Sequence, residues 1–95
     1  MKIKKEFVLR NIAGESILVP TGTTTEEFNG MITLSETAAF IWENLEEAET
    51  FQQLVQLILD EFEVEDQLAA RDAFGFISEL VKRGICEPEK EDGSW

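Results

Sequence analysis

The sequence predicts an α+β fold, in which a three-stranded antiparallel sheet is followed by three helices. Short segments rich in β-forming residues occupy the first third of the chain. After Leu34 the spacing of apolar residues changes from about two to about 3.6. Ser35, Thr50 and Asp66 are residue types that cap helices, and each precedes a run with helical spacing. Strands first and helices after are typical of a sheet packed against a helical layer.

We expect the three strands at residues 7–10, 16–20 and 30–34. Gly14 lies between the first two and can take the positive φ that a hairpin turn requires. Pro20 cannot donate a hydrogen bond to a neighbouring strand, so it ends its strand or lies on an edge. The first two strands are therefore predicted to form a hairpin.

We expect the helices to begin after their caps, and the third to end at Gly84, a residue type that commonly terminates helices. Gln53 stands three residues after Thr50, which is the spacing of a capping box. Trp42 lies on an alanine-rich face of the first helix, and we expect it to anchor the core. These features predict a helical layer packed against the sheet.

The chain is long enough for one domain, which we place at residues 1–87. Residues 88–95 are predicted to be a flexible acidic tail. Residues 21–27 are expected to form a polar loop. The first residues, which include three lysines, are expected to be solvated and partly flexible.

Residues that catalysis or metal binding would need are missing from the sequence. The chain has no histidine, no tyrosine and a single cysteine, so it offers neither a Cys-His pair nor a zinc ligand set. Its glycines form no phosphate-binding motif. We expect Cys86 to be a buried inert thiol, with Ile85 and Cys86 extended against the core. Acid–base catalysis by carboxylates stays open, but we predict no catalytic residue, no metal and no cofactor.

The charge of the chain disfavours nucleic acid as a partner. Twenty acidic and eight basic residues give a net charge of −12, which opposes a polyanion. No apolar run approaches the roughly 20 residues of a membrane span, and the first ten residues do not resemble a signal peptide. We therefore expect a cytoplasmic protein that contacts neither nucleic acid nor membrane.

Several segments in the same order resemble the PqqD family. They are the hairpin of residues 10–20, the segment of residues 28–34, the run LSETAAFIWENL of residues 34–45, and Asp72-Ala73 followed by Phe76, Leu80, Gly84 and Ile85. The resemblance covers about residues 5 to 87, and the Ile41-Trp42 pair is its best single mark. The chain differs in having Ser35 where the family often has Asn or Asp.

This resemblance implies a winged helix-turn-helix-like RiPP recognition element, which is an accessory peptide chaperone and not an enzyme. Such domains bind the leader segment of a ribosomally synthesised precursor peptide and present it to a modifying enzyme, often a radical SAM protein. The product is a peptide-derived cofactor, such as pyrroloquinoline quinone, or another natural product. The leader is expected to add as a strand to the third strand and to lie beside the third helix.

The candidate peptide-binding residues follow from this mode. On the third strand they are Gly30, Met31, Ile32, Thr33 and Leu34; on the third helix they are Arg71, Phe74, Ser78, Val81 and Lys82. The side chains of Ile32 and Leu34 are expected to fill the core, which leaves the backbone edge and the outward Met31 and Thr33 for the peptide. Phe74 and Val81 would form a groove wall, or else one margin of a broad core face.

Two other functions remain open at this point. A winged-helix DNA-binding regulator would share the architecture. Arg71, Lys82 and Arg83 alone would bind the phosphates of DNA poorly in a chain with this net charge. An acidic adaptor that docks on another protein would also fit the composition. Fold alone does not choose among them.

Overall fold

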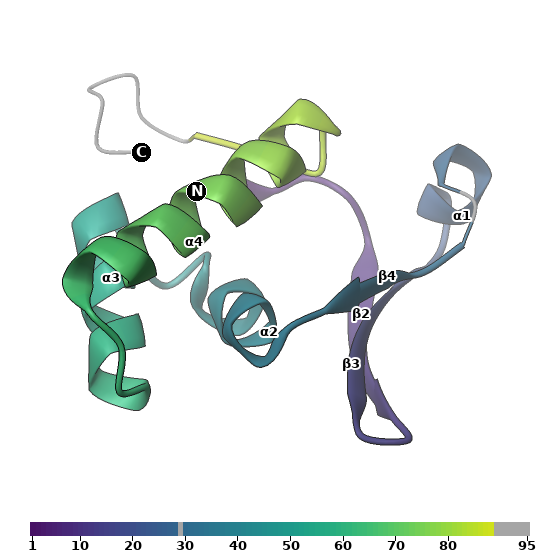
Figure 1. The fold of residues 1–95 in the computed structure, drawn as a ribbon. Helices are drawn as coiled ribbons and strands as arrows, with labels where there is room; N and C mark the ends of the chain where they lie inside the picture. The colour runs from purple at the N-terminus through teal and green to yellow at the C-terminus, as the bar shows by residue number, and fades with distance from the viewer. Residues whose placement is uncertain (29, 89–95) are drawn as a thin grey trace.

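A sheet and a helical layer make up the part of the chain that the computed structural model describes, residues 1–28 and 30–88. The sheet lies on one side of the molecule and three helices on the other (Figure 1). Its order is β2-β3-β4, with both pairs antiparallel, and the strands are β2 (Phe7–Ile12), β3 (Glu15–Pro20) and β4 (Ile32–Leu34). The helices are α2 (Glu36–Asn44), α3 (Phe51–Glu61) and α4 (Asp66–Lys82). The predicted α+β class, with this sheet followed by three helices, is confirmed.

The hairpin of β2 and β3 has a two-residue turn. Ile12 pairs with Glu15, so only Ala13 and Gly14 connect the strands. Both have positive φ, 52° for Ala13 and 83° for Gly14, as a type I′ turn requires. This turn matches the right-handed twist of the strands, and the positive φ expected at Gly14 is confirmed.

Two short elements, β1 (Lys2–Ile3) and α1 (Thr24–Glu27), were not predicted. A third, β5 (Cys86–Glu87), overlaps the segment of Ile85 and Cys86 that was expected to be extended against the core. α1 lies within the expected polar loop, and the buried Thr24 accepts a 2.9 Å hydrogen bond through Oγ1 from the N–H of Glu6. That bond ties α1 to the chain just before β2, which a local sequence pattern does not reveal.

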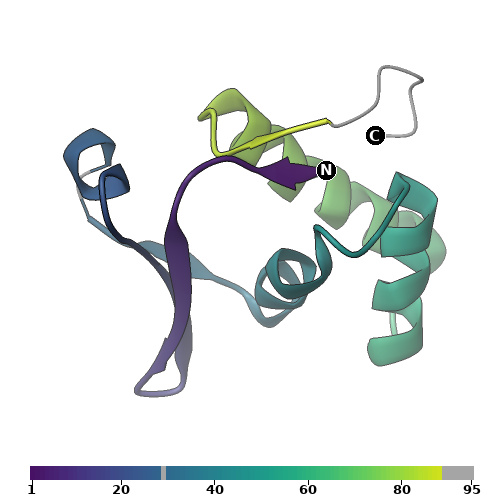
Figure 2. The ribbon, with the colours of Figure 1, turned by 180° about the vertical axis from the view of Figure 1, so that it is seen from behind.

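The N-terminus is ordered by a strand pair, which corrects the expectation of a flexible segment. β1 pairs antiparallel with β5, and the Lys4 N–H donates a 2.7 Å hydrogen bond to the carbonyl of Ile85 (Figure 2). The Lys4 ammonium lies 3.2 Å from a carboxylate oxygen of Glu87, and that of Lys5 lies 2.6 Å from one of Glu27. β5 lies more than eighty residues after β1 in the sequence, so no local sequence pattern predicts this strand pair.

The caps expected for α2 and α3 are confirmed. Ser35 Oγ accepts a hydrogen bond from the N–H of Ala38, and Thr50 Oγ1 accepts one from the N–H of Gln53, each at 3.1 Å. The Gln53 side chain in turn accepts from the N–H of Glu49 at 2.8 Å. These bonds satisfy N–H groups that have no partner within a helix.

The start of α4 differs by one residue from the prediction. Glu65 is the N-cap and Asp66 is the first helical residue, with no side-chain capping bond. Asp66 still places a negative charge in the first turn, where the helix dipole favours it. The predicted end is confirmed: Gly84 has φ 74°, and the N–H of Ile85 bonds to the carbonyl of Leu80 at 2.9 Å. This is the Schellman geometry.

The core lies between the sheet and the helices. Its largest fully buried side chains are Leu18, Ile41, Leu45, Leu54, Ile58, Ile85 and Cys86. Trp42 is 8% exposed, which confirms it as a core anchor. The Cys86 thiol is buried as expected, and burial together with the charge of Glu46 raises its pKa to about 12. The described residues share one core cluster. The predicted tail, apart from Pro88, lies outside the described residues.

Candidate peptide-binding site

β4 presents an open edge of the sheet. One side of β4 pairs with β3, through the register Ser16↔Leu34, Ile17↔Thr33 and Leu18↔Ile32. Within the described ranges, no strand pairs with the other side. An unpaired edge carries free backbone N–H and C=O groups that a further strand can use.

The side chains around β4 alternate as the prediction requires. Leu34 is buried and Ile32 packs partly buried against the core, so both serve the core as expected. Thr33 is exposed, and Met31, just before β4, is 62% exposed. Gly30 has φ 97°, a conformation that other residues rarely adopt, and it sets the direction in which the chain enters β4. A peptide on this edge would meet Met31 and Thr33 and leave the core undisturbed.

A hollow of about 490 Å³ begins where β4 ends. We call it the α2–α4 hollow, and its lining consists of Ser35, Thr37, Ala38, Ile41, Arg71, Asp72, Gly75 and Phe76. Ser35 follows Leu34 directly, and the last four residues belong to α4. The N-terminal turn of α2 therefore links the strand edge to one flank of α4.

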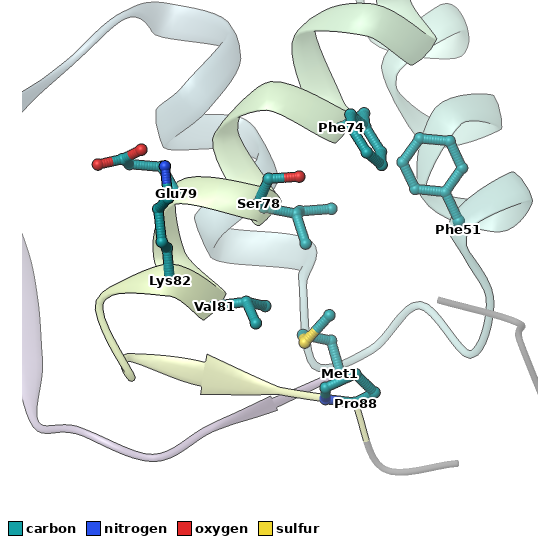
Figure 3. Close-up of a pocket in the computed structure, with 9 residues that line it drawn as sticks. Met1, Phe51, Phe74, Ser78, Glu79, Val81, Lys82 and Pro88 are labelled. Carbon is teal, nitrogen blue, oxygen red and sulfur yellow. The ribbon is translucent and has the colours of Figure 1, made fainter. Parts of the chain in front are cut away.

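The other candidates on α4 lie around a separate cavity of about 410 Å³. This Phe74 cavity is lined by Met1, Phe51, Phe74, Ile77, Ser78, Glu79, Val81, Lys82 and Pro88 (Figure 3). At 100° per residue, Phe74 and Phe76 point about 160° apart around the helix. The sequence-predicted site is divided between two concave surfaces: Arg71 lines the α2–α4 hollow, whereas Phe74, Ser78, Val81 and Lys82 line the Phe74 cavity.

Sequence reasoning did not assign the rest of the α2–α4 hollow to the site. Thr37, Ala38, Asp72 and Phe76 lie in the segments that resemble the PqqD family but were not predicted to contact the peptide, and Gly75 is not among those residues. The two edges of the apolar face of α4 carry similar types of residue, so the sequence alone does not distinguish them. Which margin faces β4 depends on how α4 crosses α2, and no local pattern encodes that crossing.

Each of the two concave surfaces has one cation, Arg71 or Lys82, that forms no ion pair with a described residue. Arg83 lies 3.0 Å from Glu79, and Lys4 and Lys5 are also in ion pairs. Neither Arg71 nor Lys82 forms an ion pair with a described residue. In a chain with a net charge of −12, two such cations are well placed to meet acidic groups of a ligand.

Among residues 1–28 and 30–88 there is no group of three side chains that could hold a metal ion. No helix within those residues is long and apolar enough to cross a membrane. A free strand edge that leads into a partly apolar hollow beside a helix can hold an extended peptide. The fold and the site therefore define a small α+β binding domain.

The chain belongs to the PqqD family, because the model of that family, described as coenzyme PQQ synthesis protein D, matches residues 8–85. The chain is also similar in structure to a protein solved as "TbiB1 in Complex with the TbiA(beta) Leader Peptide". That similarity has a TM-score of 0.68 and 25% sequence identity, and covers 96% of this chain and 100% of the other. A comparison with curated proteins finds no match. Membership of this family makes the chain an accessory binding protein and not an enzyme.

Proposed function

We propose that this protein binds the leader segment of a ribosomally synthesised precursor peptide and presents it to a modifying enzyme. The observation that carries the proposal is the open edge of β4 in a PqqD-family chain. The similarity to TbiB1, which was solved with a leader peptide, supports a leader peptide as the ligand. The proposal includes a radical SAM protein as the modifying enzyme, and a cytoplasmic location, where ribosomes make the precursor.

In this proposal the leader pairs with Ile32–Leu34 as a fourth strand of the sheet. Backbone hydrogen bonds supply affinity with little dependence on sequence, each contributing about 0.5–1.5 kcal/mol net. The outward side chains of Met31 and Thr33 contact alternate residues of the peptide, because strand side chains alternate between faces.

Specificity comes from the α2–α4 hollow. A strand that continues past the end of β4 reaches Ser35 and then the flank of α4 that carries Phe76 and Arg71. The partly buried Phe76 ring and Ala38 offer apolar contact, and Arg71 offers a cation without an ion pair in the described chain. We therefore propose that the leader carries an apolar residue followed or preceded by an acidic one.

Amide NMR titration with the leader of the precursor encoded beside the gene tests the proposal. We expect the largest shifts at residues 31–34 and around Phe76. Shifts confined to α3, with residues 31–34 silent, would contradict it.

Two N-methylated leader peptides provide a matched control for strand pairing. In a strand, the backbone groups of alternate residues point to the same side. One peptide is N-methylated at every second residue, and the other carries the same number of methyl groups shifted by one residue. Strand addition predicts that one phase loses most of its affinity and the other keeps it. Equal affinity of the two peptides would argue against pairing with β4.

A further inference from the structure

The sheet has a second open edge, at β2. The strand order β2-β3-β4 leaves one side of β2 without a partner strand among the described residues. β2 has six residues, twice as many as β4, and a long open edge is a surface with which another chain can pair. The two open edges lie at opposite ends of the strand order, so both can be occupied at the same time.

A hollow of about 570 Å³ lies between β2 and α2. We call it the β2–α2 hollow, and its lining consists of Ile3, Lys5, Glu6, Phe7, Leu9, Thr21, Trp42, Glu43 and Glu46. Phe7 and Leu9 are alternate residues of β2, so they share one face of the strand, and with Trp42 they form an apolar floor. Figure 2 shows β2 (purple) on the near side of the sheet, with α2 next to it. A strand added to the open edge of β2 would direct every second side chain toward this hollow.

The rim of the β2–α2 hollow is negatively charged. Three carboxylates line it, from Glu6, Glu43 and Glu46, and Lys5 is the one cation in the lining. The Lys5 ammonium lies 2.6 Å from Glu27, which is outside the hollow. Glu46 accepts one hydrogen bond, from a backbone N–H of β1, whereas the side chains of Glu6 and Glu43 form no hydrogen bond or ion pair with a described residue. The described chain therefore leaves this charge without a counter-charge.

We propose that the modifying enzyme docks here, with an extended segment that pairs with β2 and inserts an arginine into the β2–α2 hollow. The inference rests on the proposed function, because a protein that presents a leader has to bind the enzyme while the leader is bound. Arginine fits both parts of the hollow: its planar guanidinium forms paired hydrogen bonds with carboxylates, and its face packs on aromatic rings such as the partly exposed Phe7. A second copy of this chain is disfavoured as the occupant, since two copies with a net charge of −12 each repel one another.

Calorimetric titration with the modifying enzyme encoded beside the gene measures docking directly, with and without the leader. The double variant Glu6→Gln and Glu43→Gln removes two carboxylates from the rim. The matched control is Glu61→Gln and Glu63→Gln, at and just after the end of α3, where both residues are exposed. Each double variant removes two negative charges. We expect the first to weaken enzyme binding by about 1.4- to fivefold for each carboxylate, mostly at low salt, and the control to have no effect. Leader affinity should stay the same in both.

Acetyl-arginine amide is a probe of the proposed side chain, and acetyl-citrulline amide is its neutral counterpart of nearly the same shape. In NMR titrations the arginine compound should shift the resonances of Phe7 and of the Trp42 indole more than the citrulline compound does. Equal effects of the two compounds would exclude a guanidinium as the occupant.

Hydrogen exchange locates the two contacts. Amides of residues 7–12 should become protected when the enzyme is added, and those of residues 32–34 when the leader is added. The inference is overturned if the enzyme does not bind, if it binds without protecting residues 7–12, or if both double variants lose the same affinity. Protection of residues 7–12 that grows with the concentration of this protein alone also overturns it, because a second copy would then occupy β2. Failure of the leader to bind is a separate result, and it contradicts the proposed function.

Discussion

The rings of Phe7 and Trp42 meet edge to face, with their centroids 6.1 Å apart and their planes at 79°. Phe7 belongs to β2 and Trp42 to α2, so the contact joins the sheet to the helical layer. The ring of Phe28 also packs against that of Phe7, with the two ring centroids 5.4 Å apart. The contact therefore helps to hold the sheet, which carries the open edge of β4, against the helical layer.

Removing the indole of Trp42 should destabilise the fold strongly. We expect Trp42→Ala to lower the free energy of unfolding by about 3–5 kcal/mol, through lost burial and the cavity left behind. Trp42→Phe keeps one ring in the contact and should cost less. Urea denaturation followed by circular dichroism measures both. Val64→Ala, at an exposed position, is the control and should change stability by less than about 0.5 kcal/mol. A cost for Trp42→Ala as small as that of the control would mean that the contact is not structural.

Gly75→Ala should raise stability and weaken leader binding. Gly75 lies inside α4, where glycine is about 0.8–1.0 kcal/mol less favourable than alanine, and a Cβ there would meet nothing within 4 Å. The added methyl group nevertheless narrows the α2–α4 hollow. Thermal melts and calorimetric titration with the leader separate the two effects.

Gly84→Ala is the matched control for Gly75→Ala. Its φ of 74° makes a side chain unfavourable by about 1–2 kcal/mol, but it lies outside the hollow, so leader affinity should not change. If Gly75→Ala is more stable and binds the leader unchanged, the leader does not pass through the hollow.

Arg71 and Lys82 should differ in their effect on leader binding. Arg71 lines the α2–α4 hollow and Lys82 lines the Phe74 cavity. We expect Arg71→Ala to weaken binding of an acidic leader by about 1.4- to fivefold, as exposed ion pairs contribute roughly 0.2–1 kcal/mol. The effect should shrink at high salt. Lys82→Ala should leave the affinity unchanged. Titrations at two salt concentrations measure this. A larger loss for Lys82→Ala would place the peptide at the Phe74 cavity instead of the α2–α4 hollow.

The thiol of Cys86 should make stability depend on pH in the alkaline range. Its pKa is raised from 9.0 to about 12 in the folded protein, so the folded state holds this proton more tightly than the unfolded state. The resulting stability is fully present below about pH 9 and is lost as the pH rises toward 12. Unfolding free energies of the protein and of Cys86→Ala should therefore converge over this interval. Because lysines titrate there too, only the difference between the two proteins is informative. A constant difference would contradict the raised pKa.

The local parts of the fold could be predicted because each depends on residues close in sequence. Ser35 and Thr50 cap helices through backbone groups three residues away, and Gly14 and Gly84 terminate elements through their own φ. The outward and inward faces of β4 follow from the alternation of strand side chains. The short α1 was missed because its hydrogen bond from Glu6 to Thr24 joins residues on either side of the hairpin.

The sequence by itself determined the α+β class, the order of the elements, the core position of Trp42, and the absence of histidine chemistry. Only the tertiary structure decided that β1 pairs with β5 and that the candidate residues of α4 face two different surfaces. The spacing of apolar residues shows which face of a helix is apolar, but it does not show toward which neighbouring element that face points. The crossing of α4 over α2 sets that orientation, and it results from side chains distant in sequence that pack around a common core.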